Sequence, residues 1–135
     1  MTVVEKGQRD MSNMDRLERI VADLPEVERV DIAAWDDQPT FRVRGKNFVF
    51  CNAEVERLTV KLPHDEAAAV VATDPAAEPT GYGLGRHGWI TVAVPVDSTD
   101  DRWEQVTEWV RTSYTLVAPK RLARLVTEAD GAPQD

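Results

Sequence analysis

The stretch Phe41-Arg-Val-Arg-Gly-Lys-Asn-Phe-Val-Phe50, continued by Arg57-Leu-Thr-Val-Lys-Leu62, decides the fold. Apolar residues recur at every second position on both sides of Gly45-Lys46. This alternation is typical of strands with one buried face, and a glycine between two such runs favours a tight hairpin because it accepts a positive φ. The stretch therefore predicts three strands of an antiparallel meander.

The flanking sequence adds further strands and helices to this meander. Alternation predicts one strand before it and one after it, and apolar residues at helical spacing, together with capping residues and acids at helix starts, predict the helices. The predicted order is α-β-β-β-β-α-β-α-α. It corresponds to an α+β two-layer sandwich, in which an antiparallel sheet of about five strands has its helices on one face. The added strands cover residues 28–35 and 89–94, and the helices cover residues 14–24 with Asn13 as cap, 65–72, 99–118 and a segment after Pro119.

Length and composition favour one cytoplasmic domain. The chain has 135 residues, a net charge of −8 and a single cysteine, Cys51, so no internal disulfide is expected. We predict a flexible lead-in over residues 1–12, one domain over residues 13–127 and a polar tail over residues 128–135. No apolar run is long enough for a leader or a membrane helix, so we expect no membrane association. The negative charge disfavours indiscriminate binding to nucleic acid.

Two basic segments nevertheless interrupt this acidic chain. Residues 41–62 carry a net charge of +3 and residues 111–124 a net charge of +4. Strand alternation predicts two faces. The first is covered by helices and bears Phe41, Val43, Phe48, Phe50, Leu58, Val60, Ile90 and Val92. The second bears Arg42, Arg44, Thr59, Lys61, Trp89 and Thr91, and is partly apolar through Val49 and Cys51. Basic groups beside an aromatic ring are suited to holding phosphates and stacking a base. The candidate nucleic-acid-binding residues are Arg42, Arg44, Lys46, Lys61, Trp89, Lys120 and Arg121.

A series of short motifs in fixed order resembles the MmcQ/YjbR-like family of small bacterial proteins. The motifs are Phe41-x-Val43-x-Gly45-Lys46-x-Phe48, Leu58-Thr-Val-Lys61, Gly81-Tyr82, Trp89-x-Thr91-Val92 and Ser113-Tyr114-x-Leu116-Val117-Ala118. The resemblance implies a double-wing α+β fold related to those of secretion chaperones. It also implies a DNA-binding role without agreed catalytic residues or cofactor.

The chain departs from the family pattern at two places. The family often has His directly before the Trp, whereas Gly88 stands there in this chain and His87 lies one position earlier. The family's closing Lys-Leu-Pro is replaced by Pro119-Lys-Arg-Leu122. A role tied to a His-Trp pair is therefore not carried over to this chain.

Other motifs give little support for enzymatic chemistry. Gly83-Leu-Gly-Arg-His-Gly88 reads G-x-G-x-x-G, but a loop precedes it and a strand follows it, which is the reverse of a dinucleotide site. We interpret residues 74–79 as a loop and residues 81–88 as a flexible loop before an edge strand. The two histidines and one cysteine have no zinc-site spacing, so neither a metal nor a cofactor is expected.

Four readings of the chain remain open at this stage. The basic face is DNA-binding, or it is an ordinary solvated surface. Alternatively, the protein is an interaction module or a homodimer. A small-ligand site near the glycine-rich loop is the last reading, and it would use Tyr82, Arg86 and His87.

Overall fold

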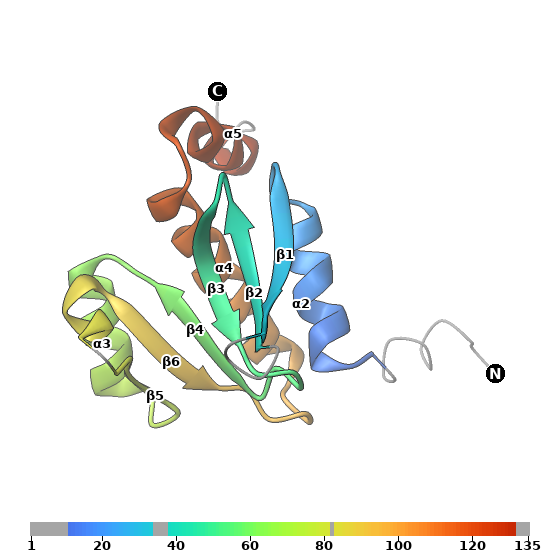
Figure 1. Cartoon of the computed structure of the whole chain (residues 1–135). Helices are drawn as coiled ribbons and strands as arrows, with labels where there is room; N and C mark the ends of the chain where they lie inside the picture. The colour runs from blue at the N-terminus through green and yellow to red at the C-terminus, as the bar shows by residue number, and fades with distance from the viewer. Residues whose placement is uncertain (1–10, 34–37, 82, 132–135) are drawn as a thin grey trace.

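The computed structural model describes residues 11–33, 38–81 and 83–131 (Figure 1). The helices and strands follow one another along the chain much as the sequence predicts. The short strand β5 and a short 3-10 helix, η2, are added before the last strand. The elements are α2 (Asn13–Ala22), β1 (Val27–Ile32), β2 (Gln38–Val43), β3 (Lys46–Cys51), β4 (Arg57–Lys61), α3 (His64–Thr73), β5 (Ala77–Pro79), η2 (Leu84–His87), β6 (Trp89–Ala93), α4 (Asp100–Val117) and α5 (Lys120–Gly131).

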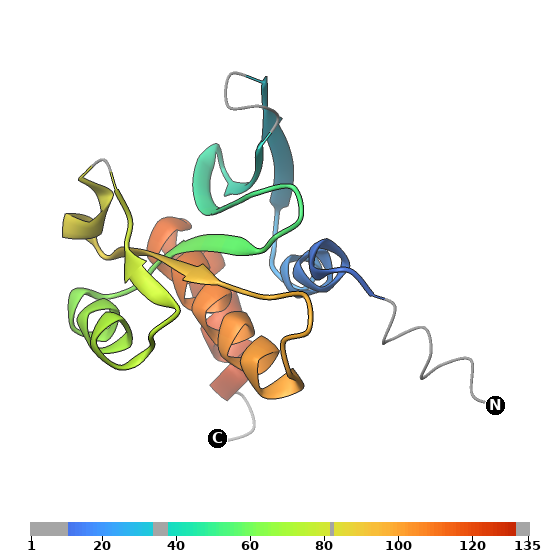
Figure 2. The same cartoon turned by 90° about the horizontal axis from the view of Figure 1, so that it is seen from below.

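The strands form one antiparallel sheet in the order β1-β2-β3-β4-β6-β5. Helices α2, α3 and α4 lie on one side of it, and β1 to β3 curl away from them (Figure 2). The predicted two-layer α+β fold with an antiparallel sheet is confirmed. The strand number is six, because β5 occupies part of the segment expected to be a loop. Only three residues long and ending at Pro79, β5 has no room for an alternating pattern.

The N-terminus of α2 starts at a different cap from the predicted one. Ser12 is the N-cap: its hydroxyl accepts from the Asp15 amide at 3.0 Å, and the Asp15 carboxylate accepts from the Ser12 amide at 3.2 Å. Asn13, the predicted cap, is buried. Its side-chain amide donates to the carbonyl oxygens of Val55 at 3.0 Å and Val94 at 2.8 Å. Asn13 therefore ties α2 to the sheet.

A bulge in β3 changes which residues face the helices. Phe41 pairs with Val49, but Arg42 pairs with Asn47, so Phe48 is an extra residue in β3. Both Phe48 and Val49 are fully buried as a result. The predicted faces of β3 are therefore wrong beyond the bulge.

The residues beyond the bulge exchange faces. Val49 and Cys51 pair with Val60 and Leu58 and belong to the core. Phe50 pairs with Thr59 and lies on the opposite side of the sheet. One residue inserted into a strand is enough to reverse the alternation that follows it.

Strands β3 and β4 diverge beyond this bulge (Figure 1), and a helix side chain fills the gap. Their pairing ends at Val49 and Val60. Where the next backbone hydrogen bond would form, the buried Ser113 hydroxyl of α4 donates to the Phe48 carbonyl oxygen at 2.7 Å. The same hydroxyl accepts from the Lys61 amide at 2.9 Å. The Ser113 hydroxyl thus bridges the two backbone groups that would otherwise form the next hydrogen bond between β3 and β4.

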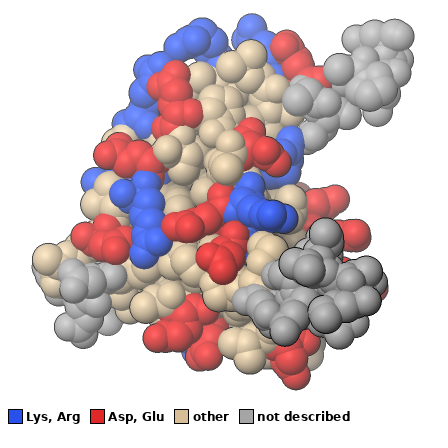
Figure 3. Space-filling model, turned by 90° about the vertical axis from the view of Figure 1, so that its right-hand side faces the viewer, with Lys and Arg blue, Asp and Glu red and all other residues tan. Residues whose placement is uncertain are grey.

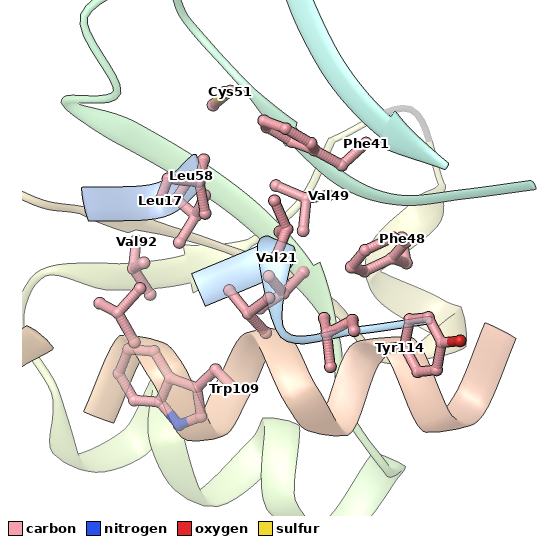
Figure 4. Packing of buried hydrophobic residues seen from close by; sticks show 14 of the residues in the cluster. Leu17, Val21, Phe41, Phe48, Val49, Cys51, Leu58, Val92, Trp109 and Tyr114 are labelled. Atoms are coloured by element: carbon pink, nitrogen blue, oxygen red, sulfur yellow. The ribbon is translucent and has the colours of Figure 1, made fainter. Parts of the chain in front are cut away.

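The core lies between the sheet and the helices α2 and α4 (Figure 4). Phe48 and Tyr114 meet edge to face with ring centroids 5.3 Å apart, and the Tyr114 hydroxyl donates to the Pro25 carbonyl oxygen at 2.7 Å. At the other end of α4, the Arg102 guanidinium bonds the Asp74 carboxylate at 2.6 Å and lies 5.2 Å from the Trp109 ring. No helix in the described residues is both long and apolar enough to span a bilayer.

Candidate nucleic-acid interface

The side of the sheet turned away from α2 and α4 carries the candidate site. We call it the open face. Cross-strand pairs share a face in an antiparallel sheet, so the register identifies its members. Its central members are Thr40, Arg42, Asn47, Phe50, Thr59, Lys61, Trp89 and Thr91, and toward its margins it also carries Glu28, Val30, Arg57 and Glu78.

Two aromatic rings and a row of hydroxyls occupy the middle of the open face. The Phe50 and Trp89 rings have centroids 5.4 Å apart at an interplanar angle of 65°. The hydroxyl of Thr91 lies 2.9 Å from that of Thr59 and 3.0 Å from that of Thr80. Phe50 and Trp89 are half-buried, and the row runs from β4 across β6 to Thr80, the residue after β5, so the surface offers ring faces beside hydrogen-bonding groups.

Two cations lie on the strands next to these rings. Lys61 is half-buried and lies directly opposite Trp89 in the ladder between β4 and β6. Arg42 is also half-buried, and its Nε donates to the Asn47 side-chain oxygen at 2.7 Å. The Asn47 amide is neutral and does not cancel this charge, whereas the acidic residue Glu28 lies directly opposite Arg42 in the ladder between β1 and β2. In strand order the open face thus presents Arg42, Phe50, Lys61 and Trp89, with Glu28 and the Arg57–Glu78 ion pair toward its margins.

The other basic candidates lie at the β2–β3 hairpin and on α5. Arg44 and Gly45 form the hairpin with φ values of 52° and 82°, as a tight turn requires. Arg44 Nη2 donates to the Glu26 carboxylate at 3.1 Å, within a salt bridge that holds the pKa of Glu26 below its usual value and raises the pKa of Arg44. The charge of Arg121 also lowers the pKa of Glu26, so α5 lies near this hairpin.

The seven predicted residues therefore do not form one patch. Lys46 is exposed at the hairpin next to Arg44, and Lys120 and Arg121 are exposed at the start of α5. Arg57, a further basic residue of the meander, is paired with Glu78 at 2.7 Å. Figure 3 shows basic and acidic side chains interspersed over the side of the molecule formed by α2 and β1. Arg42, Lys61 and Trp89 are the predicted residues that share the open face.

The glycine-rich segment joins this site at Trp89. Residues 84–87 form η2, held to the start of α3 by a 2.9 Å hydrogen bond between His64 Nε2 and the Arg86 carbonyl oxygen. The following strand β6 lies between β4 and β5, so the prediction of an edge strand was wrong. Arg86 and His87 are exposed, and Tyr82, the third residue of the ligand hypothesis, lies outside the described residues.

Gly88 gives a physical reason for the departure from the family pattern. Its φ is +90°, and a Cβ at this position would lie 2.1 Å from the Leu62 carbonyl oxygen. A histidine there requires a different backbone between η2 and β6. The Gly88 carbonyl oxygen instead accepts from the Leu62 amide at 2.9 Å, which brings β6 close to the end of β4.

The remaining reactive side chains are placed for structure. Burial raises the pKa of the Cys51 thiol to about 12, with opposing smaller effects from Arg29 and Asp31. The thiol is therefore protonated at neutral pH and is a poor nucleophile. Within the described ranges, no group of three or more His, Cys, Asp or Glu residues comes together as metal ligands would.

Comparison with known proteins now identifies the family. A family model, YjbR, matches residues 22–116, well over half of the chain. A crystal structure of the Deinococcus radiodurans protein DR2400, described as a DUF419 domain, aligns with a TM-score of 0.67 and 21% sequence identity, covering 87% of this chain and 89% of that chain. This second likeness establishes a shared fold. No curated protein matches the sequence. The chain belongs to the YjbR family.

Proposed function

We propose that this protein binds DNA through the open face and acts by binding alone, without catalysing a reaction. The observation that carries the proposal is the half-buried Trp89 ring, with Phe50 on one side and Lys61 opposite it in the ladder. Bases stack on aromatic rings whatever their identity, and nearby cations contact the phosphates. Such a surface is suited to an unpaired strand, because stacking on Trp89 needs a base that is not already stacked.

The hydroxyl row fits the same role. Threonine hydroxyls and the Asn47 amide are groups that hydrogen-bond phosphate and sugar oxygens. Asn47 lies opposite Arg42, and the threonine row begins beside Lys61 on β4 and continues across β6, so a strand crossing the sheet would meet charge, ring and hydroxyl. These groups fix the position of a backbone without reading its sequence, and we therefore expect little sequence preference.

The charge of the whole protein limits the affinity. At −8 the molecule repels a polyanion at long range, so binding depends on the two local cations. Two phosphate contacts give a slope of about −1.4 for log K against log salt concentration on single strands. We expect weak binding that is clear at 20 mM salt and faint at 150 mM.

Fluorescence anisotropy of a labelled 15-nucleotide DNA tests the proposal, with single- and double-stranded forms compared. Lys61→Gln should lower the affinity and reduce the salt slope by about 0.7. Lys120→Gln removes the same charge from α5 and should change neither value appreciably. Equal effects of the two variants would show that only net charge matters, and no binding at 20 mM salt would end the proposal.

A second variant separates stacking from charge. Trp89→Leu keeps an apolar contact for Phe50 but removes the ring, and stacking of one base contributes about 1–3 kcal/mol. We expect roughly 5- to 100-fold weaker binding with an unchanged salt slope. Circular dichroism confirms that the variant is folded. Wild-type affinity in this variant would exclude Trp89 as the stacking platform.

A further inference from the structure

We propose that two copies of this chain pair through β1, forming a dimer whose two-fold axis passes through Val30. β1 is at the end of the strand order, and within the described residues β2 is its only strand neighbour. It runs for six residues without proline, in continuous register with β2. The outer backbone groups of such a strand are a template for another strand. The opposite edge differs, since β5 has three residues and ends in proline.

Among the residues that the structure describes, those around β1 leave room for a second strand. A groove of about 340 Å³ lies between α2 and β1, lined by Glu18, Leu24, Glu26, Val27 and Arg29 among others. The helix therefore does not close over this margin of the sheet. Side chains of an added strand that point toward α2 would enter this groove.

The charges on β1 are complementary to themselves. Arg29 and Asp31 lie on the side facing α2, where Arg29 bonds Asp31 at 2.9 Å and Glu18 at 2.7 Å. In an antiparallel pair centred on Val30, each Arg29 lies opposite the partner's Asp31. Opposite charges directly across two strands are stabilising, and the two-fold axis supplies this pair twice. On the open-face side, Val30 meets its own copy, and each Glu28 lies opposite the uncharged Ile32 of the other copy.

The same charges disfavour the neighbouring registers. A pair centred on Arg29 puts two guanidinium groups opposite each other, and a pair centred on Asp31 or Glu28 does the same with two carboxylates. Like charges directly opposite are destabilising. An axis through Val30 is therefore the register that β1 specifies, and it joins the two open faces side by side on one continuous sheet.

The interface is small, which sets the expected strength. A six-residue strand pair buries less than the roughly 1,200 Å² of lasting complexes, so we expect a dissociation constant on the order of 100 μM. Sedimentation velocity from 10 μM to 1 mM should show a monomer that converts to a dimer. A monomer throughout this range would overturn the proposal.

Charge reversal tests the register. Arg29→Asp and Asp31→Arg each place like charges across the axis, and each variant should dimerise at least tenfold more weakly. Mixing them restores both opposite-charge pairs, so the mixture should form a heterodimer that neither variant forms alone. The Arg29→Asp/Asp31→Arg double variant should also recover self-association. Single variants that dimerise like the wild type, or a mixture that stays monomeric, would refute pairing through β1.

A cross-linking variant gives a readout that does not depend on charge. The native Cys51 is buried, so Val30→Cys provides the reactive thiol. Two such residues on the axis have Cα atoms about 4.5–5.5 Å apart, within disulfide range. Val96→Cys, at a position 73% exposed, is the control for random collision. We expect faster disulfide formation for Val30→Cys, and equal rates would argue against the axis.

Discussion

Ser113→Ala removes the hydroxyl that stands between β3 and β4. Two backbone groups lose their partner: the Phe48 carbonyl oxygen, now 2.7 Å from the hydroxyl, and the Lys61 amide, now 2.9 Å away. Ser113 is fully buried, so water cannot simply replace it. Each unsatisfied group costs about 1–3 kcal/mol.

The expected loss of unfolding free energy is therefore about 2–6 kcal/mol, a large share of the roughly 5–15 kcal/mol of a typical domain. The melting temperature should fall by about 10 °C or more. Urea unfolding followed by tryptophan fluorescence measures the global loss. Hydrogen exchange of the Lys61 amide measures the local loss of stability. We expect the exchange rate of this amide to rise by a larger factor than the global unfolding constant.

The control is Ser98→Ala, which removes an exposed hydroxyl bonded to the Pro95 carbonyl oxygen at 2.6 Å. This change should cost well under 1 kcal/mol, because water satisfies the carbonyl. If Ser113→Ala costs as little as the control, β3 and β4 have closed together and bonded directly. That result would refute the assignment of Ser113 as a required bridge.

Three further substitutions probe the frame of the site. Asn13→Asp replaces two donated hydrogen bonds by a carboxylate facing two carbonyl oxygens, and should lower the free energy of unfolding by about 3 kcal/mol or more in urea. Gly88→Ala places a Cβ against the Leu62 carbonyl oxygen and should lower the melting temperature sharply. Burial alone would raise the pKa of Asp74, but hydrogen bonds from Arg102 and a backbone amide outweigh it and lower the pKa. The stability that Asp74 contributes is thus present above its unfolded pKa and is lost as the pH falls through its folded pKa. Arg102→Gln should therefore reduce the dependence of the unfolding free energy on pH in this acidic range.

Each of these has an outcome that would contradict it. Asn13→Asp as stable as the wild type at pH 7 would mean that the amide bonds contribute little. A normal melting temperature for Gly88→Ala would show that the strand ends can separate without loss. If the pH dependence of Arg102→Gln in this acidic range matches that of the wild type, Asp74 is not a source of it.

Alternation in the sequence predicted most of the sheet because most strands have one buried face. Phe41 and Val43 on β2, Leu58 and Val60 on β4, and Ile90 and Val92 on β6 are all buried as expected. Each of these strands is regular, so the two-residue period holds along its length. The tight turn at Gly45 was equally readable, because a left-handed conformation there favours glycine.

The residues of the site could be predicted only in part. Neither the bulge at Phe48 nor the Ser113 bridge between β3 and β4 is indicated by residue type. Three apolar residues in a row from Phe48 to Phe50 fit either phase of the strand, and the register alone decides between them. Phe50 was consequently assigned to the core and missed as part of the open face. The sequence also did not show that Arg44 pairs with Glu26 at the hairpin, or that the pairing of β3 with β4 ends at Val49 and Val60.

The short contact between β3 and β4 gives the sheet a natural place to bend. β1 and β2 share six residue pairs, whereas β3 and β4 share three before Ser113 takes over. The sheet thus has two halves of three strands, β1-β2-β3 and β4-β6-β5, which are joined by the short β3–β4 pairing. Helix α4 packs against both β3 and β4. A small change of the angle between the two halves, at the boundary between β3 and β4, would alter the distance between Arg42 on one half and Lys61 on the other without breaking any strand. The distance between the two positive charges that a ligand meets then depends on the angle between β3 and β4 as much as on the side-chain conformations.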